Sequence, residues 1–291
     1  MKETIGWIGV GSMGHRMSRH LVEGGYPVVV ADAVSTERAP PGSTVAKSNA
    51  EVARQADIII LSLPDGAVSQ AVAKEIAATA PRRVTTVIDT STIGIKAAQA
   101  VAATLSAAGI EFIDAPVSGG TAGADKATLA VMLACPAPAF ARVKPIISLM
   151  GKPFHAGDQP GQGQAIKLLN NFLSATALAA TSEAIAFGTG QGIEMQTILD
   201  IVNASTGRNT ATDDKFPRRI MHGRYDAGFT AKLQLKDIRL YLENARAAGI
   251  TDEIASVVVD VWSQMDADLP GSDITEMYPF TQKGRRRRKP A

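Results

Sequence analysis

The stretch that decides the fold is IGWIGVGSMG, residues 5–14. Its apolar first half predicts a buried strand, and the helical spacing of apolar residues over 15–23 predicts a helix directly after it. Between the two stands the pattern G-x-G-x-x-G, which is made by Gly9, Gly11 and Gly14. The chain therefore begins with a strand, a glycine-rich turn and a helix.

A strand-to-helix junction with these glycines is typical of dinucleotide binding. The first glycine permits a tight turn, the second lets backbone approach a pyrophosphate, and the third lets the helix pack closely on the strand. The start of the helix presents free N–H groups to the phosphates. Because the sequence on both sides fits, we predict a dinucleotide-binding loop here. Its residues are Gly9, Gly11, Ser12, Met13 and Gly14.

A second apolar run, residues 27–31, predicts a strand that ends at Asp32. Asp32 lies 18 residues after Gly14, close to the spacing of about 20 at which a carboxylate binds the adenosine ribose. The same carboxylate would repel a 2′-phosphate, so the sequence favours NAD over NADP as the cofactor. The structural alternative is an aspartate that only starts a turn, which the glycine pattern upstream disfavours.

Strand-like and helical patterns alternate in the rest of the first half. Apolar runs predict strands over 58–63, 84–89, 111–115 and 129–134, and helical spacing predicts helices over 68–78 and 96–108. Alternation of this kind gives an α/β domain with a doubly wound parallel sheet of the Rossmann type. Ligands bind such a sheet at the carboxyl ends of its strands.

Three short segments stand at these strand ends. Leu63 and Pro64 follow one strand, and Thr92 follows the next, where it either binds the nicotinamide half of the cofactor or belongs to the cap of the following helix. Residues 118–120, Ser-Gly-Gly, expose backbone N–H groups that suit a carboxylate or another oxyanion. The alternative for this third segment is a simple glycine-rich turn.

A long helix is predicted over 163–188, because the segment is rich in Ala, Leu and Glu and contains no proline. Lys167 and Asn171 lie one turn apart near its start, so both side chains point to the same side. They form a pair of donors aimed at one point. In the alternative interpretation, Lys167 only lies along apolar surface and Asn171 only binds local backbone.

Five motifs, in order, resemble those of the β-hydroxyacid dehydrogenases, the family of 3-hydroxyisobutyrate dehydrogenase. They are GVGSMGHRM at 9–17, DTSTI at 89–93, DAPVSGG at 114–120, GQGQAIKLLNN at 161–171 and KD at 236–237. The resemblance covers the chain from about residue 5 to about residue 250. Ala127 departs from the glycine that the family often has, and the basic C-terminal run has no family counterpart.

The resemblance implies NAD-dependent, reversible oxidation of a small 3-hydroxy acid, such as 3-hydroxyisobutyrate, to its semialdehyde or keto acid. It implies Lys167 as the general acid and base with Asn171 assisting, and Thr92 and Lys236 near the cofactor. The segment that it implies as the seat of the substrate carboxylate consists of Ser118, Gly119 and Gly120. For a lysine, whose pKa is about 10.4 in water, to act as a base near neutrality, desolvation or a neighbouring cation must lower that pKa.

Two other functions stay open. An imine reductase has the same architecture, but Lys167 and the carboxylate seat argue against that activity. A non-catalytic dinucleotide-binding reader of nucleosomes or nucleic acid is suggested only by the basic run 285–289. Without the five cations of this run, the formal charge of +2 becomes −3. A solvated tail explains the run better, so nucleic acid is not the expected partner.

The second half of the chain is helical in pattern over 195–203, 233–248 and 252–266. We therefore predict an NAD-binding domain over 1–162, an all-α substrate and oligomerisation domain over 163–280 that begins with the long helix, and a disordered basic tail over 281–291. The Ala- and Leu-rich helical half predicts a homo-oligomer, a dimer or tetramer.

The whole-chain composition agrees with two domains. The chain has 291 residues, of which 45% are hydrophobic and 20% charged, as in ordinary globular proteins. It has neither a long apolar run typical of a membrane span nor the pattern of a signal peptide, and it has one cysteine, so we expect a cytoplasmic protein. Its four histidines lack the spacing of metal ligands, and we expect no metal.

Overall fold

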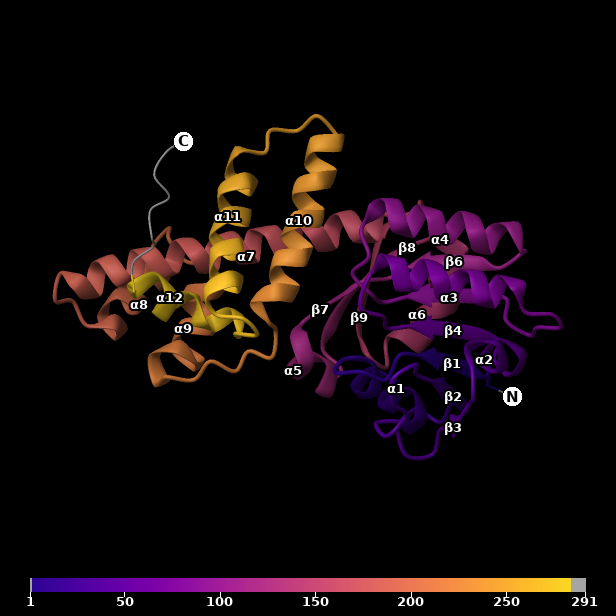
Figure 1. The fold of residues 1–291 in the computed structure, drawn as a ribbon. Coiled ribbons are helices and arrows are strands. Elements are labelled where there is room, and N and C mark those ends of the chain that lie inside the picture. The colour runs from indigo at the N-terminus through magenta and orange to yellow at the C-terminus, as the bar shows by residue number, and fades with distance from the viewer. Residues whose placement is uncertain (1, 284–291) are drawn as a thin grey trace. The chain divides into compact units, whose positions relative to one another are not determined.

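A computed structural model describes residues 2–283, which fall into two compact units (Figure 1). Unit 1 ends at Lys167, and unit 2 begins at Leu168. Both limits lie within one helix, α7 (Gln162–Gly190), whose first turn also holds the boundary expected from the sequence. The basic run 285–289 lies outside the described residues.

Unit 1 is built on one mixed, mostly parallel sheet. Its order is β3-β2-β1-β4-β5-β6-β8-β7, with β9 paired to β8. The strands are β1 (Ile5–Ile8), β2 (Val28–Ala31), β3 (Thr44–Val45), β4 (Ile58–Leu61), β5 (Thr86–Asp89), β6 (Glu111–Asp114), β7 (Val117–Ser118), β8 (Leu129–Ala134) and β9 (Gly151–Gly157). β1 pairs with both β2 and β4, so β2 and β3 are added to the sheet on one side of β1 and β4 to β6 on the other. The loop after β1 lies at this switch point of the strand order.

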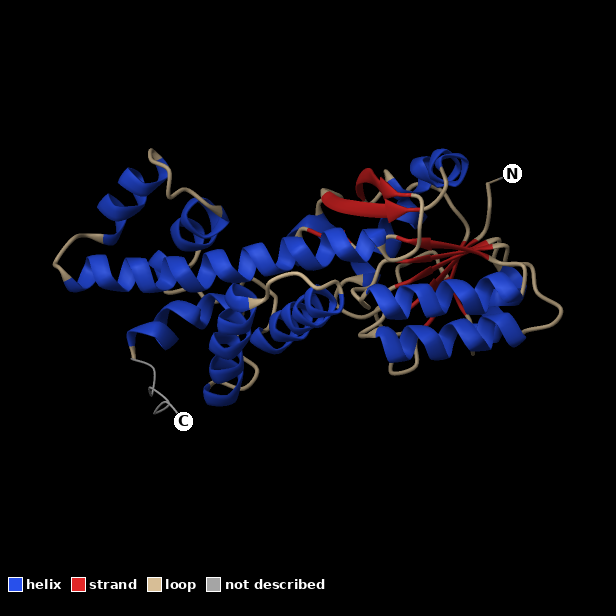
Figure 2. Cartoon of the chain, turned by 90° about the horizontal axis from the view of Figure 1, so that it is seen from above, coloured by secondary structure: helices blue, strands red, loops and turns tan. Residues whose placement is uncertain are grey.

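Helices cover both faces of the sheet, as Figure 2 shows for unit 1. They are α1 (Gly14–Glu23), α2 (Asn49–Gln55), α3 (Gly66–Ala78), α4 (Ile95–Ala107), α5 (Gly120–Asp125) and α6 (Ala137–Ile147). Alternate residues of each strand enter different cores: Ile58 and Ile60 pack with α1, α5 and α6, whereas Ile59 and Leu61 pack with α2, α3 and α4. This period of two follows from the strand pleat. The predicted doubly wound Rossmann-type architecture is confirmed.

The sheet differs from the prediction in one respect, since it is not wholly parallel. β8 is antiparallel to both β6 and β7. The connection from β7 to β8 explains this, because residues 119–128, which include the short α5, provide less chain than a parallel crossover requires. The short strands β3 and β7 and the edge strand β9 were not predicted from the sequence, and neither were α2, α5 and α6.

Unit 2 is helical, as predicted. It contains the rest of α7, with α8 (Met195–Asn203), α9 (Phe216–Arg218), α10 (Ala231–Ala247), α11 (Glu253–Asp268) and α12 (Met277–Gln282). Its core joins Leu178 of α7, Ile238 of α10 and Trp262 of α11. The Trp262 indole N–H also donates to the Ala175 carbonyl at 3.3 Å, so α11 is fixed to α7 by packing and by a hydrogen bond. Within residues 2–283, no helix has the length and apolar character that crossing a membrane requires.

Candidate active site

The loop between β1 and α1 needs two of its three glycines for packing. Gly9 has φ +96°, and a Cβ there would lie 2.2 Å from the Ser62 carbonyl oxygen. A Cβ on Gly14 would lie 1.9 Å from the Gly9 carbonyl oxygen. In contrast, a Cβ on Gly11 would meet no atom within 4 Å. The protein fills the space beside Gly9 and Gly14 and leaves the space beside Gly11 open for a ligand.

The start of α1 lacks the groups that usually cap a helix. Its N-cap residue, Met13, makes no side-chain cap hydrogen bond, and the first turn contains no acidic residue. The N–H groups and the positive end of the helix dipole therefore suit an anion. This uncapped start, next to the open space at Gly11, fits the pyrophosphate of a dinucleotide.

Asp32, just after β2, holds two segments of backbone. Its Oδ2 accepts from the Val10 N–H at 2.8 Å, and its Oδ1 accepts from Val34 and Ser35 at 2.8 and 3.1 Å. A carboxylate offers about four acceptor positions, so these bonds leave capacity for a ribose hydroxyl. Asp32 thus fixes the glycine loop and places a negative charge beside it.

The loops after β4 and β5 are joined by a serine. The Leu63 N–H donates to Ser91 Oγ at 2.7 Å, and the Ser91 N–H donates to Asp89 Oδ1 at 2.9 Å. Pro64 is exposed and Thr92 half-buried. Because β1, β4 and β5 are adjacent and parallel, these loops and the glycine loop lie at the same carboxyl edge.

The expected carboxylate seat spans the end of β7 and the start of α5. Ser118 is the last residue of β7, and Gly119 and Gly120 follow with φ +136° and +64°. Both glycines are exposed. Positive φ at two successive positions is easily reached only by glycine, so this segment depends on glycine for its backbone as well as for its lack of side chains.

The start of α7 is held by two buried residues that were quoted above only within motifs. Gln164 Nε2 donates to Asp114 Oδ1 at 2.7 Å and to the Ser91 carbonyl at 3.0 Å. Asp114 and Gln164 are both fully buried. The signal that could have found them is a polar residue at the end of an apolar strand and another in the first turn of an apolar helix.

Lys167 follows Gln164 by three residues on the same helix, so the two lie on one side of it. Lys167 is only 9% exposed, whereas Ile166 between them is 39% exposed. A lysine is rarely buried to this degree unless its ammonium group has a partner or a function. Unit 1 therefore contains the glycine loop, the segment 118–120 that is the expected carboxylate seat, and the buried Lys167.

Asn171 and Lys236 belong to unit 2, where both contact Asp237. The Asn171 side-chain N–H donates to Asp237 Oδ2 at 2.6 Å, and Lys236 Nζ lies 3.0 Å from Asp237 Oδ1. Gln234 adds a bond to the Asn171 carbonyl at 3.2 Å. Asp237 is 2% exposed. The sequence motif KD contained this aspartate, but its part in orienting Asn171 was not predicted.

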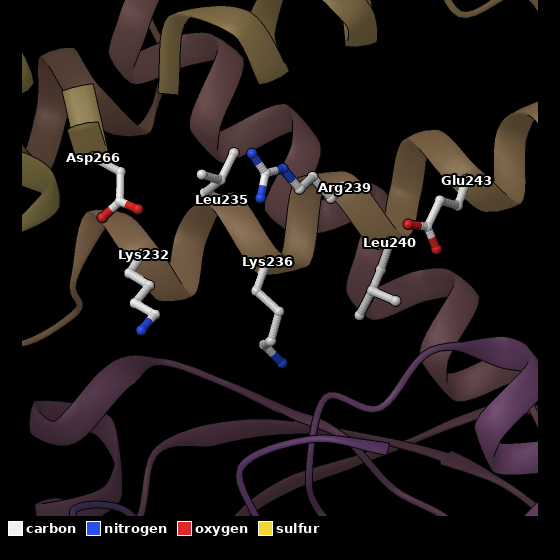
Figure 3. A pocket seen from close by; sticks show the side chains of 7 residues that line it. All are labelled: Lys232, Leu235, Lys236, Arg239, Leu240, Glu243 and Asp266. Carbon is white, nitrogen blue, oxygen red and sulfur yellow. The ribbon is translucent and has the colours of Figure 1, made fainter. Parts of the chain in front are cut away.

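Lys236 also lines a pocket of about 320 Å³ on α10 and α11 (Figure 3). The residues around it are Lys232, Leu235, Lys236, Arg239, Leu240, Glu243 and Asp266. Three cations and two carboxylates share this wall, so it carries a small positive excess. Among residues 2–283, no group of three or more His, Cys, Asp or Glu side chains is arranged to hold a metal ion.

Two protein-family models match the chain in succession. Residues 4–159 match the NAD binding domain of 6-phosphogluconate dehydrogenase. Residues 161–281 match the model described as NAD-binding of NADP-dependent 3-hydroxyisobutyrate dehydrogenase. The chain belongs to the 3-hydroxyisobutyrate dehydrogenase family. The resemblance inferred from the motifs is confirmed.

Individual members of this family align over nearly the whole chain. The 2-(hydroxymethyl)glutarate dehydrogenase of Eubacterium barkeri is 32% identical, with 90% of this chain and 95% of the relative covered. The mitochondrial 3-hydroxyisobutyrate dehydrogenase of Drosophila melanogaster is 32% identical, with 97% and 90% covered. The structure of Mycobacterium tuberculosis 3-hydroxyisobutyrate dehydrogenase with L-serine has 31% identity and a TM-score of 0.90, with 96% and 99% covered. This family member is thus one of the NAD(P)-dependent dehydrogenases that act on CH–OH groups of 3-hydroxy acids.

In this dehydrogenase, two carboxyl groups at the edge of the sheet have raised pKa values. Asp89 and Asp114 are register partners on β5 and β6. Burial raises the pKa of Asp114 to about 6, in spite of the hydrogen bonds from Gln164, which lower it. Burial also raises the pKa of Asp89. Ionisation of these two buried carboxyl groups therefore lowers the free energy of unfolding.

We expect Asp114 to make the stability of this dehydrogenase fall as pH rises from 3.8 to about 6. In this window the unfolded chain has released the proton while the folded chain still binds it, so the free energy of unfolding decreases with pH. The expected loss is roughly 3 kcal/mol, at 1.36 kcal/mol per pKa unit.

Urea unfolding of the wild type and of Asp114→Asn across this pH range checks the expectation. In the variant, the free energy of unfolding should fall less steeply with pH, because the contribution of Asp114 is removed. The contribution of the same sign from Asp89 remains. Equal slopes in the two proteins would contradict it.

Proposed function

We propose that this dehydrogenase catalyses the reversible, NAD-dependent oxidation of a small 3-hydroxy acid, with Lys167 as the general acid and base. The observation that carries the proposal is the 9% exposure of Lys167 at the start of α7, in the same compact unit as the dinucleotide loop. A buried amine beside a hydride-transfer cofactor is suited to taking and returning an alcohol proton.

The names of the relatives indicate the substrate class. 2-(Hydroxymethyl)glutarate, 3-hydroxyisobutyrate and L-serine all contain a CH₂OH group on the carbon that carries a carboxylate, and they differ in the remaining substituent. We infer a substrate of this type, with its carboxylate on Ser118, Gly119 and Gly120. The positive φ values and exposure of the two glycines support this seat.

In the proposed reaction, the dinucleotide that the glycine loop would hold would supply the hydride acceptor for the carbinol carbon. Lys167 takes the hydroxyl proton during oxidation and returns it during reduction. Asn171 donates one side-chain N–H to Asp237, and we assign its second N–H to the substrate oxygen. Asp237 would orient the amide for this role, and the ion pair with Lys236 holds Asp237 in turn. Thr92, Leu63, Pro64 and Lys236 are assigned to the cofactor.

We propose NAD as the preferred cofactor, because the Asp32 carboxylate would repel a 2′-phosphate. Asp32→Asn should lower the ratio of kcat/KM for NAD to that for NADP by about tenfold, or 1.4 kcal/mol. The single oxygen of asparagine can still accept from the Val10 N–H of the glycine loop, whereas the bonds from Val34 and Ser35 are lost, so the loop should persist. Steady-state kinetics with both cofactors measure the ratio. Glu3→Gln, which removes an exposed carboxylate elsewhere in unit 1, should leave it unchanged, and an unaltered ratio in Asp32→Asn would contradict the assignment.

The experiment that tests the proposed function is a panel of 3-hydroxy acids and semialdehydes, each assayed with NAD and NADP. The panel should contain 3-hydroxyisobutyrate, 3-hydroxypropionate, serine and 2-(hydroxymethyl)glutarate. We expect turnover of at least one acid, with NAD preferred, and loss of turnover when its carboxylate is replaced by an amide. Absence of NADH formation and of NADH consumption throughout the panel would overturn the proposal.

We also propose that the protein is a homo-oligomer. Large apolar side chains of unit 2 are exposed on α7 and α11, among them Leu173 at 60%, Phe187 at 71% and Val257 at 60%. Exposed apolar groups gathered on helices are typical of surfaces that become buried in an assembly.

A further inference from the structure

The side-chain hydrogen bonds of Gln164, which hold the first turn of α7, are not used in the chemistry proposed above. The Gln164 side chain is fully buried and uses all its hydrogen-bonding capacity within unit 1. Its Oε1 accepts from the backbone N–H groups of Ile93 and Gly94, at 2.9 and 3.1 Å. Its Nε2 donates to the Ser91 carbonyl and to Asp114 Oδ1, at 3.0 and 2.7 Å. An amide with every donor and acceptor engaged has one orientation only.

Asp114 completes this arrangement from the end of β6. Its Oδ2 accepts from the backbone N–H groups of Gly161 and Gln164, at 3.1 and 3.0 Å. The first turn of α7 contains no acidic residue. A carboxylate from the sheet therefore satisfies the N–H groups that the start of a helix leaves unpaired and faces the positive end of the helix dipole.

The same glutamine thus binds two segments that carry site residues. One is the loop over 91–94, which contains Thr92 and is tied through Ser91 to the loop at Leu63. The other is the start of α7, where Lys167 follows three residues later on the same side of the helix. If the Gln164 amide turned, it would lose the hydrogen bonds that join these two segments.

We propose that Gln164 and Asp114 are positioning residues, which fix Lys167 relative to the loop that carries Thr92. This inference rests on the proposed function, because it requires Lys167 to be the acid and base. Neither residue transfers a proton to substrate. Their effect comes from geometry, since a displacement of about 1 Å in a reacting group can reduce the rate about a hundredfold.

Two variants test the inference. Gln164→Met keeps the side-chain volume and removes all four side-chain hydrogen bonds, so kcat should fall about 10- to 100-fold.

Asp114→Asn removes a buried carboxyl group whose pKa is raised by burial, so this variant should fold even if Gln164→Met does not. With its oxygen on the backbone N–H groups of Gly161 and Gln164, the asparagine places its side-chain NH₂ opposite the NH₂ of Gln164. The Gln164 amide must then turn, and kcat should fall about tenfold. In both variants the Kd for NAD should stay within about twofold of the wild type, with kcat expressed per folded molecule.

A matched control is Gln162→Met, two residues earlier. Gln162 is exposed, and its Oε1 accepts from Gln159 N–H within the preceding loop. This variant should retain wild-type kcat, which separates the role of Gln164 from general effects of changing the start of the helix.

A double-mutant cycle separates positioning from a purely structural role. In the Lys167→Ala background, where no amine remains to be placed, adding Gln164→Met or Asp114→Asn should change the residual single-turnover rate less than twofold. The same fractional loss in both backgrounds would overturn the inference, and so would wild-type kcat in folded Asp114→Asn. Wild-type kcat in Lys167→Ala alone would instead overturn the proposed function, and this inference with it.

Discussion

Lys167→Ala should lower kcat by about 10²–10⁴-fold, the contribution typical of a positioned general acid or base. The alanine variant lacks the only group that we assign to proton transfer, while the glycine loop and Asp32 that would hold NAD are unchanged. The Kd for NAD should therefore stay within about twofold of the wild-type value. Steady-state turnover and a fluorescence titration with NAD measure the two quantities.

The control for this variant is Lys144→Ala. Lys144 is an exposed lysine of α6 in the same unit, so its removal should leave both kcat and NAD binding unchanged. If Lys167→Ala turned over substrate at the wild-type rate, the lysine would not be the acid and base. If it lost NAD binding as well, the amine would have a role in holding the cofactor.

The second large effect is expected for Gly14→Ala. The added Cβ would lie 1.9 Å from the Gly9 carbonyl oxygen, and because that oxygen belongs to the backbone, only a shift of α1 or of the loop relieves the clash. Overpacking of this kind costs about 1–3 kcal/mol or more, and the shift would disrupt the start of α1. Urea unfolding should show the lost stability, and NAD binding should be lost with it.

Gly11→Ala provides the contrast. No atom lies within 4 Å of the Cβ position, so the stability should stay within about 0.5 kcal/mol of the wild type. The methyl group would enter the space that we assign to the pyrophosphate, so the Kd for NAD should rise at least about tenfold. Equal effects of the two alanines on stability would contradict the distinct roles given to these glycines.

The elements that the sequence predicts are those with apolar runs or long helical spacing. β4 and β5 are wholly buried strands, and α7 has a proline-free run that is longer than that of any other helix among residues 2–283. The apolar residues of these elements are themselves the buried ones, so the elements can be predicted without knowing which distant residues they pack against. The glycine loop could be recognised from residues 9–14 together with the strand pattern before them and the helical pattern after them.

The unpredicted elements depend on partners instead of on their own pattern. β9 contains Pro153 and three exposed residues, Lys152, Phe154 and His155, and it is a strand because β8 offers it a parallel edge. Likewise, the sequence of α6 contains Pro145, which argues against a helix. The antiparallel direction of β8 could have been inferred from the short connection before it.

The candidate site shows the same division. Lys167 and the segment at 118–120 were predicted as site residues from their motifs and from the resemblance to the family. Gln164 and Asp114 were not, because their hydrogen bonds join residues 47 to 73 positions apart. A buried polar residue has the same letter as an exposed one, and only the fold shows which donors and acceptors surround it.

The central claim is that the amine of Lys167 transfers the proton of the reacting hydroxyl group. The most direct test is single-turnover NADH formation by Lys167→Ala, measured at fixed pH with increasing concentrations of a small primary amine. We predict a slow reaction without amine and a rate that rises with the concentration of the amine's free base. NADH formation at the wild-type rate without added amine would contradict the claim.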